Sequence, residues 1–118
     1  MLLSMSSCEN QSDASKTAGE YDIVSPSDYN LNVKEGEGAI VRDYVDNAET
    51  AQQIADAVIK SIVGEKQFSE LIGVHISYDP ENGIWLVDRN LGPLVFGGDY
   101  LCAIKKSNGE ILKVVAGE

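Results

Sequence analysis

The most regular hydrophobic pattern of the chain lies in residues 48–63. Apolar residues recur there at intervals of three and four, which places them on one side of a helix. The positions on that side are Ala51, Ile54, Ala55, Val58 and Ile62. Asp46 or Asn47 can cap the start, and with Asp46 as the cap Glu49 completes a capping-box pattern. Because Gly64 suits the left-handed end of a helix, the pattern predicts an amphipathic helix over residues 48–63.

After this helix the apolar residues recur at every second position, which is typical of strands. In residues 74–78 apolar positions alternate with His75 and Ser77. The predicted strands are residues 74–78, 84–87, 99–106 and 111–116, separated by turn-forming residues at 79–83 and 107–110 and by a loop over 89–98. One helix followed by an antiparallel meander predicts an α+β domain. We expect one main helix packed on a curved sheet of about four strands.

The region before residue 48 has weaker patterns. Tyr29, Leu31 and Val33 alternate with polar residues like a short edge strand. Residues 9–20 are small and polar, which is typical of a flexible tether. Residues 1–8, MLLSMSSC, resemble the end of a bacterial lipoprotein signal, in which Cys8 would be lipidated. We therefore interpret residues 1–20 as a truncated signal remnant with a tether, or Cys8 as an ordinary free thiol, and residues 21–118 as a single α+β domain.

Four segments of the sequence, taken in order, share a pattern with a known family. Residues 44–58 read YVDNAETAQQIADAV, and residues 83–87 read GIWLV. Two glycines at residues 97–98 precede the next predicted strand. Residues 106–112 read KSNGEIL, and Gly117 follows near the end.

Together these segments resemble polymorphic-toxin immunity proteins with a nuclear-transport-factor-2-like fold. The resemblance extends over about residues 39–118. It implies a cystatin-like cone in which a helix lies against a curved sheet. It also implies a bacterial protein that binds a toxin domain and converts no substrate.

The charge of the chain narrows the choice of partner. Lys and Arg number 9 and Asp and Glu number 19, which gives a formal net charge of −10. Phosphate contacts need clustered Lys and Arg, so this balance argues against nucleic acid. An acidic surface permits a basic protein partner, whose approach it would accelerate. No apolar run approaches the roughly 20 residues that cross a bilayer, so the only membrane attachment we expect is a lipid on Cys8.

The sequence offers little for catalysis, and we predict neither an enzyme nor a cofactor or metal. His75 is the single histidine and lies on the polar side of its strand. No Gly-x-Ser-x-Gly, Walker or Gly-x-Gly-x-x-Gly motif is present. The alternative is a small-molecule-binding or hydrolase- or isomerase-like domain with Tyr44 and Asp46 in the cavity of the cone. Cys102 lies in an alternating apolar segment, where a free cysteine behaves as a small buried hydrophobe.

Residues 91–96, LGPLVF, form an apolar stretch inside a loop rich in glycine and proline. Such a stretch either folds back onto the core or presents an apolar contact surface. Trp85 on its strand is interpreted as a core aromatic, with an interface residue as the alternative. The residues expected to contact a partner are Asp79, Glu81, Asp88, Arg89, Leu94, Phe96 and Asp99.

Three hypotheses follow for the function. The first is an immunity-type protein that neutralises a toxin by non-covalent occlusion. The second is the cavity-based enzyme, and the third is a structural lipoprotein of the bacterial envelope. The location is periplasmic if Cys8 is lipidated and cytoplasmic otherwise.

Overall fold

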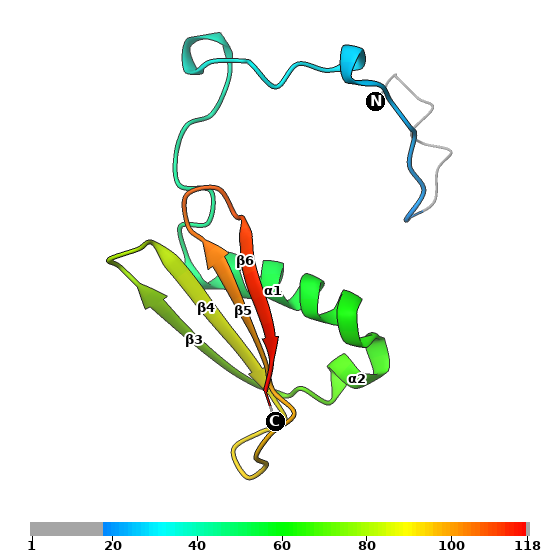
Figure 1. Cartoon of the computed structure of the whole chain (residues 1–118), viewed down its shortest axis with the longest axis vertical. Helices are drawn as coiled ribbons and strands as arrows, with labels where there is room; N and C mark the ends of the chain where they lie inside the picture. Colours follow the sequence, from blue (N-terminus) through cyan, green and yellow to red (C-terminus); the bar gives the residue numbers. More distant parts are fainter. Residues whose placement is uncertain (1–17, 118) are drawn as a thin grey trace, which may run out of the picture. The chain divides into compact units, whose positions relative to one another are not determined.

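The computed structural model describes residues 18–117 (Figure 1), and its contacts divide the chain after Ile40. Cys8 and most of the expected tether therefore lie outside the described residues. The described part before Val41 has two short 3-10 turns, Pro26–Asp28 and Glu35–Glu37. The expected edge strand over residues 29–33 was wrong. The side chain of Asn30 accepts a hydrogen bond from the backbone N–H of Asn32 at 2.9 Å, and this local turn competes with an extended strand.

The main helix, α1, extends from Ala48 to Val63, as the hydrophobic pattern predicted. Asn47 caps it, because its side-chain oxygen accepts a hydrogen bond from the N–H of Thr50 at 2.8 Å. Of the two residues predicted as possible caps, Asn47 is therefore confirmed, and Asp46 with its capping-box pattern is wrong.

One side of α1 enters the core, although not with every predicted residue. The fully buried positions are Ala51, Ala55 and Ile59. Ile62, which we placed on the buried side, is 60% exposed. A short second helix, α2 (Glu65–Ser69), follows the Gly64 that ends α1, and the sequence did not indicate it.

Four strands form one antiparallel sheet in the order of the sequence. They are β3 (Gly73–Asp79), β4 (Ile84–Asn90), β5 (Tyr100–Lys105) and β6 (Ile111–Ala116). Figure 1 shows α1 lying along one face of this sheet. The predicted class, an α+β fold with one main helix on a four-stranded antiparallel sheet, is confirmed.

The core lies between α1 and the two central strands. Val87 on β4 and Cys102 and Ile104 on β5 have no exposed surface and face the helix. Cys102 is a free thiol, and burial raises its pKa. The expectation that Cys102 behaves as a buried hydrophobe is therefore confirmed.

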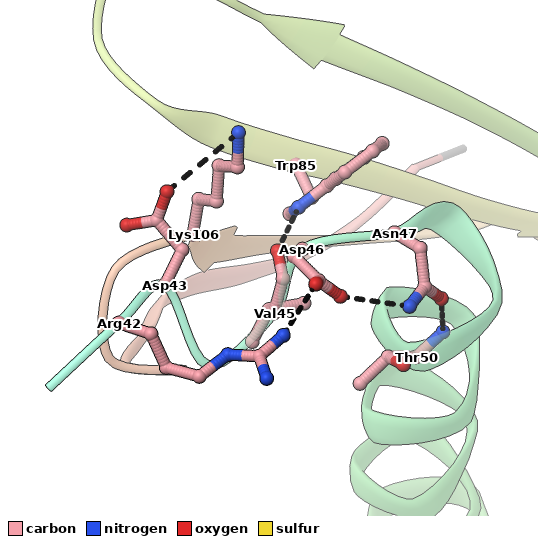
Figure 2. Close-up of polar contacts among 8 residues, drawn as sticks. All are labelled: Arg42, Asp43, Val45, Asp46, Asn47, Thr50, Trp85 and Lys106. Carbon is pink, nitrogen blue, oxygen red and sulfur yellow. Dashed lines mark hydrogen bonds and ion pairs between the residues drawn. The ribbon is translucent and has the colours of Figure 1, made fainter. Parts of the chain in front are cut away.

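The segment before α1 is tied to the sheet by hydrogen bonds (Figure 2). The indole N–H of Trp85 donates to the carbonyl oxygen of Val45 at 2.8 Å. The N–H groups of Tyr44 and Val45 donate to the carbonyl oxygens of Ser107 and Lys106, at 3.1 and 3.0 Å. These bonds fix where the helix begins relative to β4 and the turn after β5.

Trp85 packs beside the core as the sequence indicated, with its ring 4.6 Å from that of Tyr78. Replacing Trp85 by Ala removes the ring and the bond to Val45, and we expect a loss of about 3–5 kcal/mol in the free energy of unfolding. Trp85→Phe keeps most of the packing and should cost about 1–2 kcal/mol. Urea unfolding measures both losses. Ile62→Ala on the exposed side of α1 is the control, and a Trp85→Ala loss as small as that of the control would contradict the placement.

Candidate functional site

The sheet has a second face that points away from α1. Since successive side chains of a strand alternate between faces, Asp88 lies opposite Val87, on this second face. Its cross-strand neighbours are His75 on β3 and Leu101 on β5, and Val115 of β6 pairs with Leu101. Within residues 41–117 both helices lie elsewhere, with α1 on the opposite face and α2 against α1. This open face is where a partner can approach the sheet.

The loop after β4 extends the open face. Its first residue, Leu91, packs on the core. By contrast, Leu94 and Phe96 are 92% and 97% exposed, and Val95 is also exposed. The sequence left open whether this apolar stretch folds back onto the core or is exposed. Leu91 folds back, whereas Leu94, Val95 and Phe96 are exposed.

Glycines make this loop geometry accessible. Gly92 adopts a φ of 114°, and its carbonyl oxygen accepts a hydrogen bond from the N–H of Val95 at 3.2 Å, which closes a turn. Gly98 has a φ of 72°, and a β-carbon there would lie 2.8 Å from a methyl carbon of Leu91. The turn and the close approach of Leu91 together carry the apolar residues between them out into solvent.

A recess of about 300 Å³ lies between this loop and the open face. Asp88 and Asp99 both line it, together with Asn90 and residues of the loop. One carboxylate oxygen of Asp88, Oδ1, is shielded from solvent and accepts no hydrogen bond from the described residues. We call Asp88, Leu94, Val95, Phe96 and Asp99 the loop surface, and the hollow between them the loop recess.

The structure brings four of the seven predicted contact residues together in and beside this loop. They are Asp88, Leu94, Phe96 and Asp99. Asp79 and Glu81 lie at the other end of β4, in the β3–β4 turn. The six residue steps of β4 span roughly 20 Å, so the turn and the loop surface do not form one compact site. The sequence analysis missed Asn90, although an Asn two residues before Gly92 is a turn signal. Its side chain accepts a hydrogen bond from the N–H of Gly92 at 3.0 Å.

Arg89 lies on the helix side of the sheet, apart from the other predicted residues. Its Nε donates to Asp56 of α1 at 2.8 Å, and its side chain is only 14% exposed. The guanidinium also lies 5.2 Å from the ring centre of Phe68 in α2. These contacts tie both helices to β4, so Arg89 holds the fold together and is left out of the proposed contact surface.

Asp79 is occupied within its own turn. Its carboxylate accepts hydrogen bonds from the side chain of Asn82 at 2.9 Å and from the N–H of Glu81 at 3.0 Å. The hydrogen bond from the Asn82 side chain is the main cause that lowers the pKa of Asp79, followed by weaker backbone hydrogen bonds. The carboxylate of Asp79 therefore stays charged at lower pH than a free aspartate does. Any stability that this charge adds is lost as the pH falls through the lowered pKa. Glu81 is exposed.

The residues of the enzyme alternative do not converge. Tyr44 is 57% exposed and lines an open depression that Asp46 and His75 do not line. Asp46 is held by Arg42, whose Nη2 lies 2.6 Å from its carboxylate (Figure 2). His75 is exposed on the open face, beside Asp88. A general acid and a general base must both contact the same bound substrate, and this arrangement gives these side chains no common cavity.

In residues 18–117 no three His, Cys, Asp or Glu side chains gather as metal ligands. No helix of the described chain has the length and apolar character needed to cross a bilayer.

The fold and the loop surface define a small acidic α+β domain with an open sheet face and an apolar loop beside it. A family model described as NTF2 fold immunity protein matches residues 50–118. The chain belongs to this family, and the resemblance noted in the sequence is confirmed. No curated protein and no solved structure matches the chain.

Arg89 and Arg42 offer a matched comparison of two ion pairs. Arg89→Ala leaves Asp56 partly buried without its partner, and we expect a loss of roughly 1–3 kcal/mol in the free energy of unfolding. Arg42→Ala removes an ion pair whose side chains are 62% and 44% exposed, and should cost about 0.5 kcal/mol or less. Urea unfolding of both variants checks this, and equal losses would show that Arg89 does not anchor the helices.

Proposed function

We propose that this chain binds a toxin domain and neutralises it by non-covalent occlusion, with the loop surface as its principal contact. The observation that carries the proposal is the exposure of Leu94 and Phe96 next to Asp88 and Asp99. Large apolar side chains held out in solvent are typical of contact surfaces, because they gain free energy when a partner covers them. Family membership supports the same function.

Occlusion suits the chemistry of this surface. The loop surface contains two carboxylates and three apolar side chains, and no Ser, Thr, Cys, Lys or His side chain lies among them. A partner bound there would lose access to its own substrate because the apolar side chains and the carboxylates cover its surface. Affinity would come from a few anchors such as Phe96, surrounded by contacts that exclude water.

The charge of the chain supports a basic partner. The net charge of −10 creates a negative field that speeds the approach of a positive domain. Complementary charge mainly raises the association rate and selects the partner, while buried contacts set the lifetime of the complex. The acidic groups distant from the loop surface would therefore act while the partner approaches. The loop surface itself would act once the complex has formed.

Co-expression with a toxin domain, sought first in the reading frames that neighbour this one, tests the proposal. We expect the chain to restore growth and to form a complex that can be purified. The double variant Leu94→Ser/Phe96→Ser should weaken binding at least 30-fold, because two anchors are lost. Ile62→Ser removes another exposed apolar side chain, on α1 and away from the loop surface, and is the control. No protection by the native chain would refute the function, and equal weakening by both variants would refute the assigned surface.

Glu81 provides a test of electrostatic approach. Asp79 is unsuitable, because charge reversal there would break its turn. Glu81→Lys should slow association with a basic toxin domain about two- to fivefold at low salt, with an unchanged dissociation rate and an unchanged free energy of unfolding. Stopped-flow measurements at two salt concentrations give these rates. Glu65→Lys at the start of α2 is the control for net charge, and identical rates for the native chain and Glu81→Lys at low salt would contradict steering from this turn.

A further inference from the structure

The loop recess brings two carboxylates together without a positive partner. Asp88 and Asp99 both line it, and neither forms an ion pair within the described chain. The lysines of the open face, Lys105 and Lys113, lie in other cross-strand rows, paired with Ile84 and Ala103. Within residues 18–117, therefore, no Lys or Arg side chain forms an ion pair with either carboxylate of the recess.

Asp88 has the less favourable surroundings of the two. Its Oδ1 is shielded from water and accepts no hydrogen bond from the described residues, so this charged group lacks part of its solvation. A carboxylate shielded in this way is stabilised when a positive group approaches. Asp99 is held at the rim, where its side chain lies against Gly117 and its carbonyl accepts a hydrogen bond from the N–H of that glycine at 2.7 Å.

We propose that the loop recess receives an arginine side chain of the partner, with the guanidinium between Asp88 and Asp99 and its stem against Val95 and Phe96. This inference rests on the proposed function, because the arginine would come from the toxin domain. A guanidinium presents several N–H donors in one plane and can serve two carboxylates at once. Apolar and aromatic side chains beside it suit its weakly hydrated faces.

The composition of the recess favours arginine over a metal ion. Its lining contains two carboxylates and one amide, Asn90, and no third His, Cys, Asp or Glu side chain joins them within the described chain. Calcium takes six to eight oxygen ligands, and transition metals favour imidazole or thiolate, neither of which lines this recess. The volume of about 300 Å³ leaves room for a guanidinium with part of its stem.

The first test uses the full chain and N-acetyl-arginine amide, followed by NMR. We expect saturable shifts of the backbone N–H signals of Asp88, Gly97 and Asp99, and at least fivefold weaker binding in Asp88→Asn. Glu81→Gln, which removes a carboxylate from the distant turn, is the control and should bind as the native chain does. Shifts that do not saturate, or that persist unchanged in Asp88→Asn, would overturn the inference.

The second test uses the toxin complex and separates this inference from the proposed function. Asp88→Asn should weaken the complex at least tenfold, while its thermal midpoint equals or exceeds that of the native chain, because the variant removes an unsatisfied charge. If the native chain binds the toxin and Asp88→Asn binds equally well, the arginine site is refuted and the function stands. If the native chain binds no toxin, the proposed function fails, and the arginine titration still decides whether the recess takes a guanidinium.

Discussion

The contact between α1 and the two central strands determines the rest of the structure. Ala51 and Ala55 are small enough for the helix backbone to come close to the sheet, and Ile59 fills the space beside them. Val87 and Cys102 meet them from β4 and β5. Within residues 18–117 this core contains eight buried hydrophobic residues, and hydrogen bonds and ion pairs at its borders add to the stability of so small a core. Two such interactions are the hydrogen bond from Trp85 to Val45 and the ion pair of Arg89 with Asp56.

This contact also determines what remains free for a partner. A strand that buries Val87 must turn Asp88 to the opposite face, and no helix of residues 41–117 covers that face. The loop after β4 begins with Leu91 fixed to the core, which anchors one end of the exposed stretch that follows. The apolar residues of this loop are thus presented from a fixed base, and a partner would meet a surface already arranged for contact.

The features that follow from hydrophobic periodicity could be predicted from the sequence. The features that depend on which residues meet in the folded chain could not. The ends of α1 and the order of the strands follow from local patterns and turn residues, and all were predicted. Ile59 and Ile62 are both compatible with an amphipathic helix, so the pattern alone could not show which of them meets the sheet. Likewise, Arg89 was predicted to begin the loop over 89–98, but β4 extends to Asn90, and alternation along this strand places Arg89 on the face opposite to Asp88. The exposure of Leu94 and Phe96, as opposed to Leu91, depends on glycine conformations that no periodicity records.

The separation of the acidic groups gives them different physical roles. Along β4, the β3–β4 turn lies roughly 13 Å from Asp88 and roughly 20 Å from the start of the loop, whereas the Debye length is about 8–10 Å at physiological salt. A charge at Glu81 is therefore largely screened from a partner group at the loop and acts only while the two proteins approach. The Asp88 carboxylate is partly removed from solvent, where screening is weaker and a direct partner counts for more. Because Oδ1 of Asp88 accepts no hydrogen bond from the described residues, its shielding costs free energy in the folded state, and a positive group of a partner would offset that cost.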